Sequence, residues 1–223
     1  MIVNQRRALV LAAALLAGAV LLGVLVAVPS TRHYVQVVDD AVRRLAVRVQ
    51  NRPATLSAEV FAFLGGVWVN WAIRIVAFVV LAVRRQFVQL AAFALAVLTS
   101  EVLIGTVKAA YDRPRPPGSL IATSGASFPS GHAIAGAVTA VGIVLVAVPP
   151  GPARWKWEAR AIAFAFLMAL SRVYLRAHWL SDAVAGALLG GALALGWPAI
   201  LQTLRSRATA TPASDQTATR EGA

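Results

Sequence analysis

Long apolar runs alternate with short polar segments over most of the chain. Crossing a bilayer as a helix takes about 20 mostly apolar residues. Four runs exceed that length and two shorter ones are assigned as spans with them. They lie at residues 8–28, 60–83, 87–107, 133–148, 161–173 and 180–201. The pattern therefore predicts an all-α fold, an integral membrane bundle of six transmembrane helices, in a single domain at residues 1–203.

The first run has the flanking charge of a signal peptide, because Arg6 and Arg7 come directly before its apolar stretch. A signal peptide has an apolar core of about 7–15 residues, and the run at 8–28 is longer than that. We therefore predict an uncleaved first span.

Residues 34–50 are too polar to cross a membrane but show a helical period. The apolar positions are Val35, Val38, Val42, Leu45 and Val49, and Asp39 and three arginines are assigned to positions off this stripe. The pattern predicts an amphipathic helix on the membrane surface, and a helix packed on its own protein fits equally well. Residues 204–223 are polar and low in complexity, which predicts a disordered cytoplasmic tail.

The composition agrees with a membrane protein, since 59% of the residues are hydrophobic and the mean hydropathy is +0.71, above the range of soluble domains. A net charge of +12 in a soluble protein would suggest nucleic acid. Here the arginines are clustered between apolar runs, which is typical of contact with lipid headgroups. We expect the bilayer as partner and no nucleic acid. The chain has no cysteine, which excludes disulfides and Cys-ligated metals.

Six spans place both chain ends on one side of the membrane. The basic clusters on that side are Arg6/Arg7, Arg84/Arg85, residues 154–160 and Arg205/Arg207. The positive-inside rule makes this side the cytoplasmic face. The five arginines of residues 29–56 fall on the outer side and go against the rule, unless an interfacial helix holds them.

Three polar segments, at residues 108–116, 129–132 and 171–182, then meet on the outer face. One of the two lysines and two of the three histidines of the chain lie within them. His178 and Asp182 are one helical turn apart, so the carboxylate can fix the tautomer of the imidazole and raise the basicity of its other nitrogen. Taken alone, the pair also fits a histidine at a helix start beside an incidental acid.

The remaining polar residues suit an anion. Ser130 and Gly131 begin a helix, and a helix N-terminus favours an anion, although Ser130 also fits a simple helix cap. Fixed positive charge comes from Lys108, Arg115 and Arg172, and arginine matches phosphate oxygens through two parallel hydrogen bonds.

Two further arginines, Arg113 and Arg176, are assigned to lipid headgroups, because basic side chains that flank a span extend toward the membrane surface. The other residues together predict a phosphoryl-transfer site, with three cations, an oriented His178 and a second histidine, His132, for the leaving group.

These segments resemble the three-part signature of the type 2 phosphatidic acid phosphatase (PAP2) family, which shares its active site with vanadium-dependent haloperoxidases. The signature is K-x6-RP, PSGH and SR-x5-H-x3-D, and every fixed position matches in order. The matching residues are Lys108, Arg115, Pro116, Pro129, Ser130, Gly131, His132, Ser171, Arg172, His178 and Asp182. The match covers residues 108–182 and leaves out the first two spans and the tail.

The resemblance implies a helical membrane phosphatase that works through a covalent phosphohistidine, with no metal and no cofactor. By position, His178 is the nucleophile and Asp182 orients it. His132 protonates the leaving oxygen and then activates water. The residues implied to bind phosphate oxygens are Lys108, Arg115, Ser130, Gly131 and Arg172.

We therefore expect hydrolysis of a lipid phosphate or diphosphate at the outer face of the cell membrane. Candidate substrates are undecaprenyl diphosphate, phosphatidic acid and phosphatidylglycerophosphate. The alternative is a non-catalytic protein that binds or transports lipid phosphates, in which the cations would serve but the histidines and Asp182 would be superfluous. A vanadium-dependent peroxidase is disfavoured, because those relatives lack this arrangement of spans.

Two charged residues, Arg74 and Glu101, lie inside predicted spans, where a charge requires a partner. Their depths differ by about five residues, or ~7 Å at the helical rise, which an extended arginine covers. We predict that they pair below the site and that the pair is structural.

Overall fold

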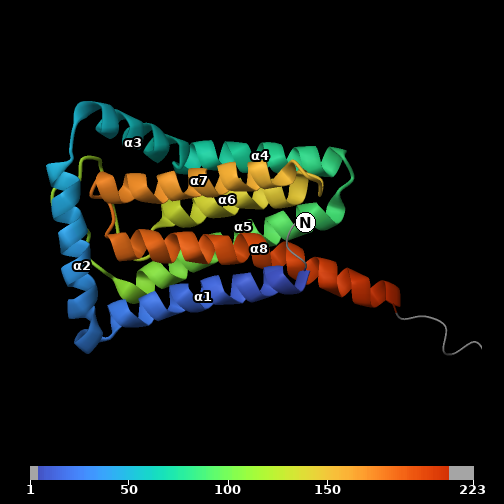
Figure 1. Cartoon of the computed structure of the whole chain (residues 1–223), viewed down its shortest axis with the longest axis horizontal. Helices are drawn as coiled ribbons and strands as arrows, with labels where there is room; N and C mark the ends of the chain where they lie inside the picture. Colours follow the sequence, from blue (N-terminus) through green and yellow to red (C-terminus); the bar gives the residue numbers. More distant parts are fainter. Residues whose placement is uncertain (1–4, 211–223) are drawn as a thin grey trace, which may run out of the picture.

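The computed structural model describes residues 5–210, which form eight helices and no strand. The helices are α1 (Gln5–Ala27), α2 (Pro29–Arg48), α3 (Arg52–Leu64), α4 (Val67–Val83), α5 (Phe87–Tyr111), α6 (Gly131–Ala147), α7 (Arg154–Tyr174) and α8 (Leu180–Ala210). The all-α prediction is confirmed. α1 and α4–α8 run along the long axis of the molecule, whereas α2 crosses one end and α3 slants back toward α4 (Figure 1).

Three of the described helices, α1, α5 and α8, are long and apolar enough to cross a membrane, and the bent pair α3–α4 makes a fourth if it is one span. α6 is apolar but has 17 residues, and α7 carries charged residues in its first turns. These helices identify an integral membrane protein. α8 continues to Ala210, so the predicted tail is helical over 204–210, and its remainder lies outside the described residues.

The predicted span at 60–83 is wrong as one continuous helix. α3 begins at Arg52, and α3 and α4 meet at an angle of 52°. The break falls at Gly65 and Gly66, the caps of the two helices. A Cβ atom on Gly65 would lie 2.5 Å from Met168 Sδ, so α7 approaches the break more closely than a side chain at this position permits.

Helix α2 starts five residues before the predicted surface helix, and only part of the predicted stripe, Val35 and Val42, packs against the protein. Asp39 and Ala46 are buried, whereas Val38 and Leu45 are more than half exposed. The buried side packs on α7 and α8. α2 therefore packs on its own protein, as one of the two alternatives expects, and keeps an apolar side exposed.

α6 lies at the centre of the bundle and contacts α4, α5, α7 and α8. The approach of α8 to α6 depends on two glycines four residues apart, Gly186 and Gly190. Cβ atoms there would lie 2.6 Å from the carbonyl oxygens of Ser130 and Ile134. Small residues at this spacing let helix backbones approach closely in membranes. This packing brings the first turns of α6 and α8 together.

The predicted ion pair between Arg74 and Glu101 is confirmed, with Nη1 and Oε1 2.6 Å apart. Arg74 Nε also donates to Thr139 Oγ1 at 2.9 Å, and Thr139 donates to Asn70 Oδ1 at 2.8 Å. The pair thus belongs to a polar cluster that joins α4, α5 and α6 within the bundle.

Candidate active site

The predicted site residues come together at the end of the bundle that α2 crosses (Figure 1). There the C-terminal ends of α5 and α7 lie beside the N-terminal ends of α6 and α8. The residues found there are Lys108 on α5, Arg115 in the following loop, Ser130, Gly131 and His132 at the start of α6, Arg172 on α7, His178 in the turn after α7, and Asp182 on α8.

The ring of His178 has a defined tautomer. Its Nδ1 lies 2.8 Å from the carbonyl oxygen of Ser127, and a carbonyl oxygen only accepts hydrogen bonds. Nδ1 therefore carries the proton, and Nε2 has a lone pair. Arg115 Nη1, which only donates, lies 3.2 Å from Nε2, in agreement with this assignment. The arrangement presents Nε2 as a nucleophile.

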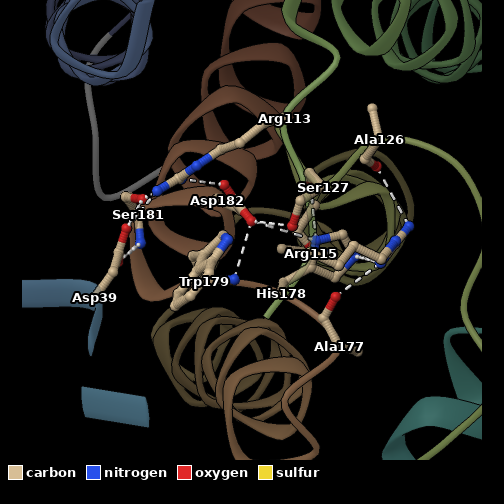
Figure 2. Close-up of polar contacts among 12 residues, drawn as sticks. Asp39, Arg113, Arg115, Ala126, Ser127, Ala177, His178, Trp179, Ser181 and Asp182 are labelled. Carbon is tan, nitrogen blue, oxygen red and sulfur yellow. Dashed lines mark hydrogen bonds and ion pairs between the residues drawn. The ribbon is translucent and has the colours of Figure 1, made fainter. Parts of the chain in front are cut away.

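Asp182 does not hydrogen-bond to the imidazole of His178 directly, although the four-residue spacing predicts that it does. Its Oδ2 is 3.7 Å from His178 Nδ1, too far for a hydrogen bond. The same oxygen accepts from Ser127 Oγ at 2.5 Å and from the backbone N–H of Trp179 at 2.9 Å (Figure 2). Ser127 replaces the expected direct bond. Its carbonyl oxygen accepts a hydrogen bond from the imidazole N–H, and its hydroxyl donates one to the carboxylate.

Burial lowers the pKa of His178 to about 4, and the nearby Asp182 carboxylate offsets this effect only in part. Burial favours the neutral form of a histidine, and here it outweighs the opposing effect of the carboxylate. His178 is therefore neutral at physiological pH, and its Nε2 keeps a lone pair, which faces Arg115 Nη1 in this structure.

Arg115 is fixed by the chain through all five of its N–H groups. Nε and Nη2 donate to the carbonyl oxygens of residues 124–126 at 2.7–3.3 Å. Nη1 donates to the Ala177 carbonyl at 2.7 Å and faces His178. Lys108 Nζ donates to the Ala126 carbonyl at 2.5 Å. Both cations therefore donate to carbonyl oxygens of the loop before α6, and Arg115 is fixed beside His178.

Arg172 differs from the other buried arginines of the described chain. Arg74, Arg113 and Arg154 each form an ion pair with a carboxylate at 2.6–2.8 Å. Arg172 is only 4% exposed, yet no described carboxylate pairs with it and its Nε has no hydrogen-bond partner. It acts electrostatically on Lys108 and on both site histidines. A buried cation without a counter-ion is costly, so this position is suited to an anion.

The start of α6 supplies the remaining predicted groups. Ser130 Oγ accepts from the Ala133 N–H at 3.4 Å, as a helix cap does, and the Ser130 N–H donates to the Asp182 carbonyl at 3.0 Å. At the next residue, Gly131, an added Cβ atom would be in ordinary van der Waals contact with Ile104, 3.6 Å away. His132 lies under the α3–α4 break, since a Cβ on Gly65 would be 2.9 Å from its ring.

Two residues that contact this site, Arg113 and Asp39, are not among those predicted from the sequence. Assignment of Arg113 to lipid headgroups is wrong, because its guanidinium is 7% exposed and pairs with both Asp39 and Asp182. Asp39 was placed off the apolar stripe, yet it follows Val35 by four residues and precedes Val42 by three. An aspartate at that spacing is on the same helix face, and this was the signal that it is buried.

Within residues 5–210 the structure groups no three His, Asp or Glu side chains in a metal-binding arrangement. The groups that could contact a bound anion are the positively charged side chains, the Gly131 region and the two histidines.

Residues 89–206, more than half of the chain, match the family model described as the PAP2 superfamily. The chain belongs to the PAP2 superfamily. The fold of this PAP2 protein is similar to that of the transmembrane PAP2-type phosphatidylglycerolphosphate phosphatase from Bacillus subtilis. That similarity has a TM-score of 0.73 at 22% identity and covers 88% of this chain and 96% of the other.

LpxE from Aquifex aeolicus is also similar to this PAP2 chain, with a TM-score of 0.57 at 23% identity over 72% of this chain and 92% of the other. A search of curated proteins found no match. At these identities the two structures establish a shared fold only. The assignment of the site residues depends on the distances and burial within this chain.

Proposed function

We propose that this protein hydrolyses a lipid phosphate or diphosphate through a covalent phosphohistidine, without a metal ion. The observation that carries the proposal is the buried Arg172, which pairs with no carboxylate of residues 5–210 and acts electrostatically on the neutral His178. A phosphate group supplies the missing negative charge, and Nε2 of His178 is the nitrogen that attacks it. Lys108 and Arg115 add fixed charge, so positive side chains provide the electrostatic stabilisation that phosphoryl transfer requires.

In the first step, the phosphate oxygens bind Arg172, Lys108 and the Ser130–Gly131 end of α6. Arg115, whose N–H groups are held by the chain, adds positive charge beside them. His178 Nε2 attacks phosphorus, a P–N bond forms, and the bond from phosphorus to the lipid oxygen breaks. His132 enters this step as the imidazolium and donates its proton to that oxygen, which leaves as a lipid alcohol or, from a diphosphate, a lipid monophosphate.

In the second step, water replaces the lipid. His132, now without its proton, accepts one from the water as its oxygen attacks phosphorus. The P–N bond breaks, inorganic phosphate leaves, and both histidines return to their starting states. Asp182 keeps its charge throughout and orients His178 by way of Ser127.

We further propose six spans, formed by α1, α3–α4, α5, α6, α7 and α8, with α2 on the outer membrane surface. The exposed cations at the opposite end of the bundle support this orientation by the positive-inside rule; they are Arg6, Arg7, Arg84, Arg85, Lys156 and Arg160. The site then faces the outside of the cell membrane.

The candidate substrates are undecaprenyl diphosphate, phosphatidic acid and phosphatidylglycerophosphate. The similar Bacillus subtilis structure is a phosphatidylglycerolphosphate phosphatase, which supports including the last of these. All three carry a terminal phosphate on a lipid, which is the group that the cations suit.

The test is phosphate release from these three lipids by the purified protein in detergent and EDTA, with His178→Ala as the matched variant. We expect turnover that survives EDTA and is lost in the variant. Turnover that EDTA abolishes, or an active His178→Ala protein, would refute the mechanism. Binding of the lipids without release from any of them would instead support the non-catalytic lipid-phosphate binder.

A further inference from the structure

A second group of buried charges lies behind Asp182, on the side away from His178 (Figure 2). Its centre is Arg113, two residues after the end of α5. Arg113 Nη1 donates to Asp182 Oδ1 at 2.6 Å and to Ser181 Oγ at 2.7 Å. Nη2 donates to Asp39 Oδ2 at 2.8 Å and to Gln36 Oε1 at 3.0 Å. One guanidinium therefore joins α2 to the carboxylate of the candidate active site.

Asp39 fixes the same region through a second route. Its Oδ1 accepts from the backbone N–H of Ser181 at 2.9 Å, and its Oδ2 accepts from the Ser181 hydroxyl at 2.6 Å. Ser181 is the second residue of α8, so Asp39 satisfies one of the free N–H groups at the helix start and lies at the positive end of its dipole. An aspartate 142 residues away thereby sets the first turn of α8, which bears Asp182.

The two oxygens of Asp182 are consequently held from opposite sides. Oδ1 is bound by Arg113, and Oδ2 is bound by Ser127 and the Trp179 N–H. Asp39 and Asp182 are 2% and 0% exposed, and partners in this environment orient strongly because water does not compete. Loss of Asp39 leaves Arg113 with Asp182 as its one carboxylate and frees the Ser181 N–H. Asp182 then shifts away from Ser127, whose carbonyl orients the nucleophile.

We propose that Asp39 and Arg113 are positioning residues for the phosphohistidine reaction, through which α2 sets the orientation of Asp182 and hence of His178. This inference rests on the proposed function. Neither residue belongs to the three-part signature, and neither contacts the reacting atoms. Their effect is expected on the rate of the chemical step and not on the affinity for the lipid.

The test compares Asp39→Asn with Asp40→Asn, a matched control on the same helix whose carboxylate is partly exposed and lies 3.8 Å from Arg43. We expect Asp39→Asn to lower kcat about 10- to 100-fold, the range found for residues that orient a catalytic group, with KM within twofold of wild type. Asp40→Asn should match the wild type in both constants.

The deciding measurement repeats Asp39→Asn in an Asp182→Asn protein. A residue that acts through Asp182 has no further effect on kcat once that carboxylate is neutral, whereas a general structural role persists. An additional 10-fold loss in the double variant, or a single variant within twofold of wild-type kcat, would overturn the proposal. A wild-type protein with no phosphate release would instead refute the proposed function.

Ser181→Ala provides the same test if Asp39→Asn does not fold. The change removes only the hydroxyl that bridges Asp39 and Arg113 and keeps the backbone N–H bond. We expect a kcat about 3- to 10-fold lower than wild type, and again no further loss in the Asp182→Asn background. An unchanged kcat in Ser181→Ala would overturn the proposal.

Discussion

The carbonyl oxygen of Ser127 lies 2.8 Å from Nδ1 of His178 and thereby determines which ring nitrogen carries the proton. The hydroxyl of the same serine donates to Asp182 Oδ2. One residue of the loop before α6 therefore orients the imidazole through its backbone and receives its own orientation from the carboxylate through its side chain.

This double role predicts the result of Ser127→Ala. The variant keeps the carbonyl that accepts from His178 and loses only the link to Asp182, so kcat should fall by about 10- to 100-fold with little change in KM. Steady-state phosphate release measures both constants. Ser124→Ala is the control, because only the backbone carbonyl of Ser124 contacts the site, and it should be fully active. Wild-type kcat in Ser127→Ala would show that Asp182 does not act through this serine.

The pH dependence should reflect a buried nucleophile. Burial lowers the pKa of His178 to about 4, and Nε2 attacks only when it is neutral. As the pH falls, kcat/KM should therefore stay high well below the ordinary histidine pKa of about 6.5 and decline near pH 4, tenfold per pH unit.

The control for this profile is the substrate itself, because a phosphate monoester changes charge near pH 6. The substrate pKa is measured separately and its contribution is divided out. His33→Gln, at an exposed position on α2, should leave the profile unchanged. A decline centred near pH 6.5 after the correction would contradict a buried, neutral His178.

The sequence predicts the parts of this site that depend on local spacing. Ser130 caps α6 as expected, because the cap is a contact between neighbours in the chain. The pairing of Arg74 with Glu101 followed from helix geometry, since the tight turn between their helices fixes the relative depth of the two residues. The signature residues also meet at one end of the bundle, as their positions at span ends imply.

Contacts between distant segments were not predictable in the same way. Arg113 was assigned to headgroups because its partner Asp39 lies 74 residues earlier, on a helix whose packing direction the sequence leaves open. The bend between α3 and α4 was missed because Gly65 and Gly66 interrupt an otherwise apolar run. Met168, on a helix about 100 residues later, lies too close to Gly65 for a side chain at that position, and the sequence does not show this contact.

The Arg74–Glu101 pair should contribute to stability and not to the chemical step. Arg74 is 1% exposed and Glu101 is 39% exposed, so removal of either partner should cost less than the ~3–5 kcal/mol typical of fully buried pairs. We expect Arg74→Gln and Glu101→Gln each to lower the free energy of unfolding by about 1–3 kcal/mol. Phosphate release per folded molecule should be unchanged.

A double-mutant cycle on unfolding in detergent measures the coupling of this pair. The coupling energy should be at least about 0.5 kcal/mol, because each variant removes the same contact. Strictly additive effects would show that the pair makes no energetic contribution. A large loss of kcat at full stability would assign these residues to the reaction instead.

Because Arg172 pairs with no described carboxylate, its replacement should raise the stability of the protein and abolish its activity. In phosphate-free buffer, Arg172→Met should be more stable than wild type by about 1–3 kcal/mol, because a buried cation without a partner is replaced by an apolar chain of similar length. This corresponds to a rise in Tm of about 2–4 °C per kcal/mol for a chain of this size. Phosphate release by the variant should be lost.

Inorganic phosphate then distinguishes an anion site from a merely unsatisfied arginine. It should raise the Tm of the wild type as its concentration increases, as any ligand of the folded state does, and leave Arg172→Met unchanged. Arg113→Met is the contrasting variant, because Arg113 is buried to a similar degree but paired with two carboxylates, and its loss should lower the Tm. A destabilised Arg172→Met protein, or a variant that still gains stability from phosphate, would show that the protein itself satisfies Arg172 and that the anion binds elsewhere.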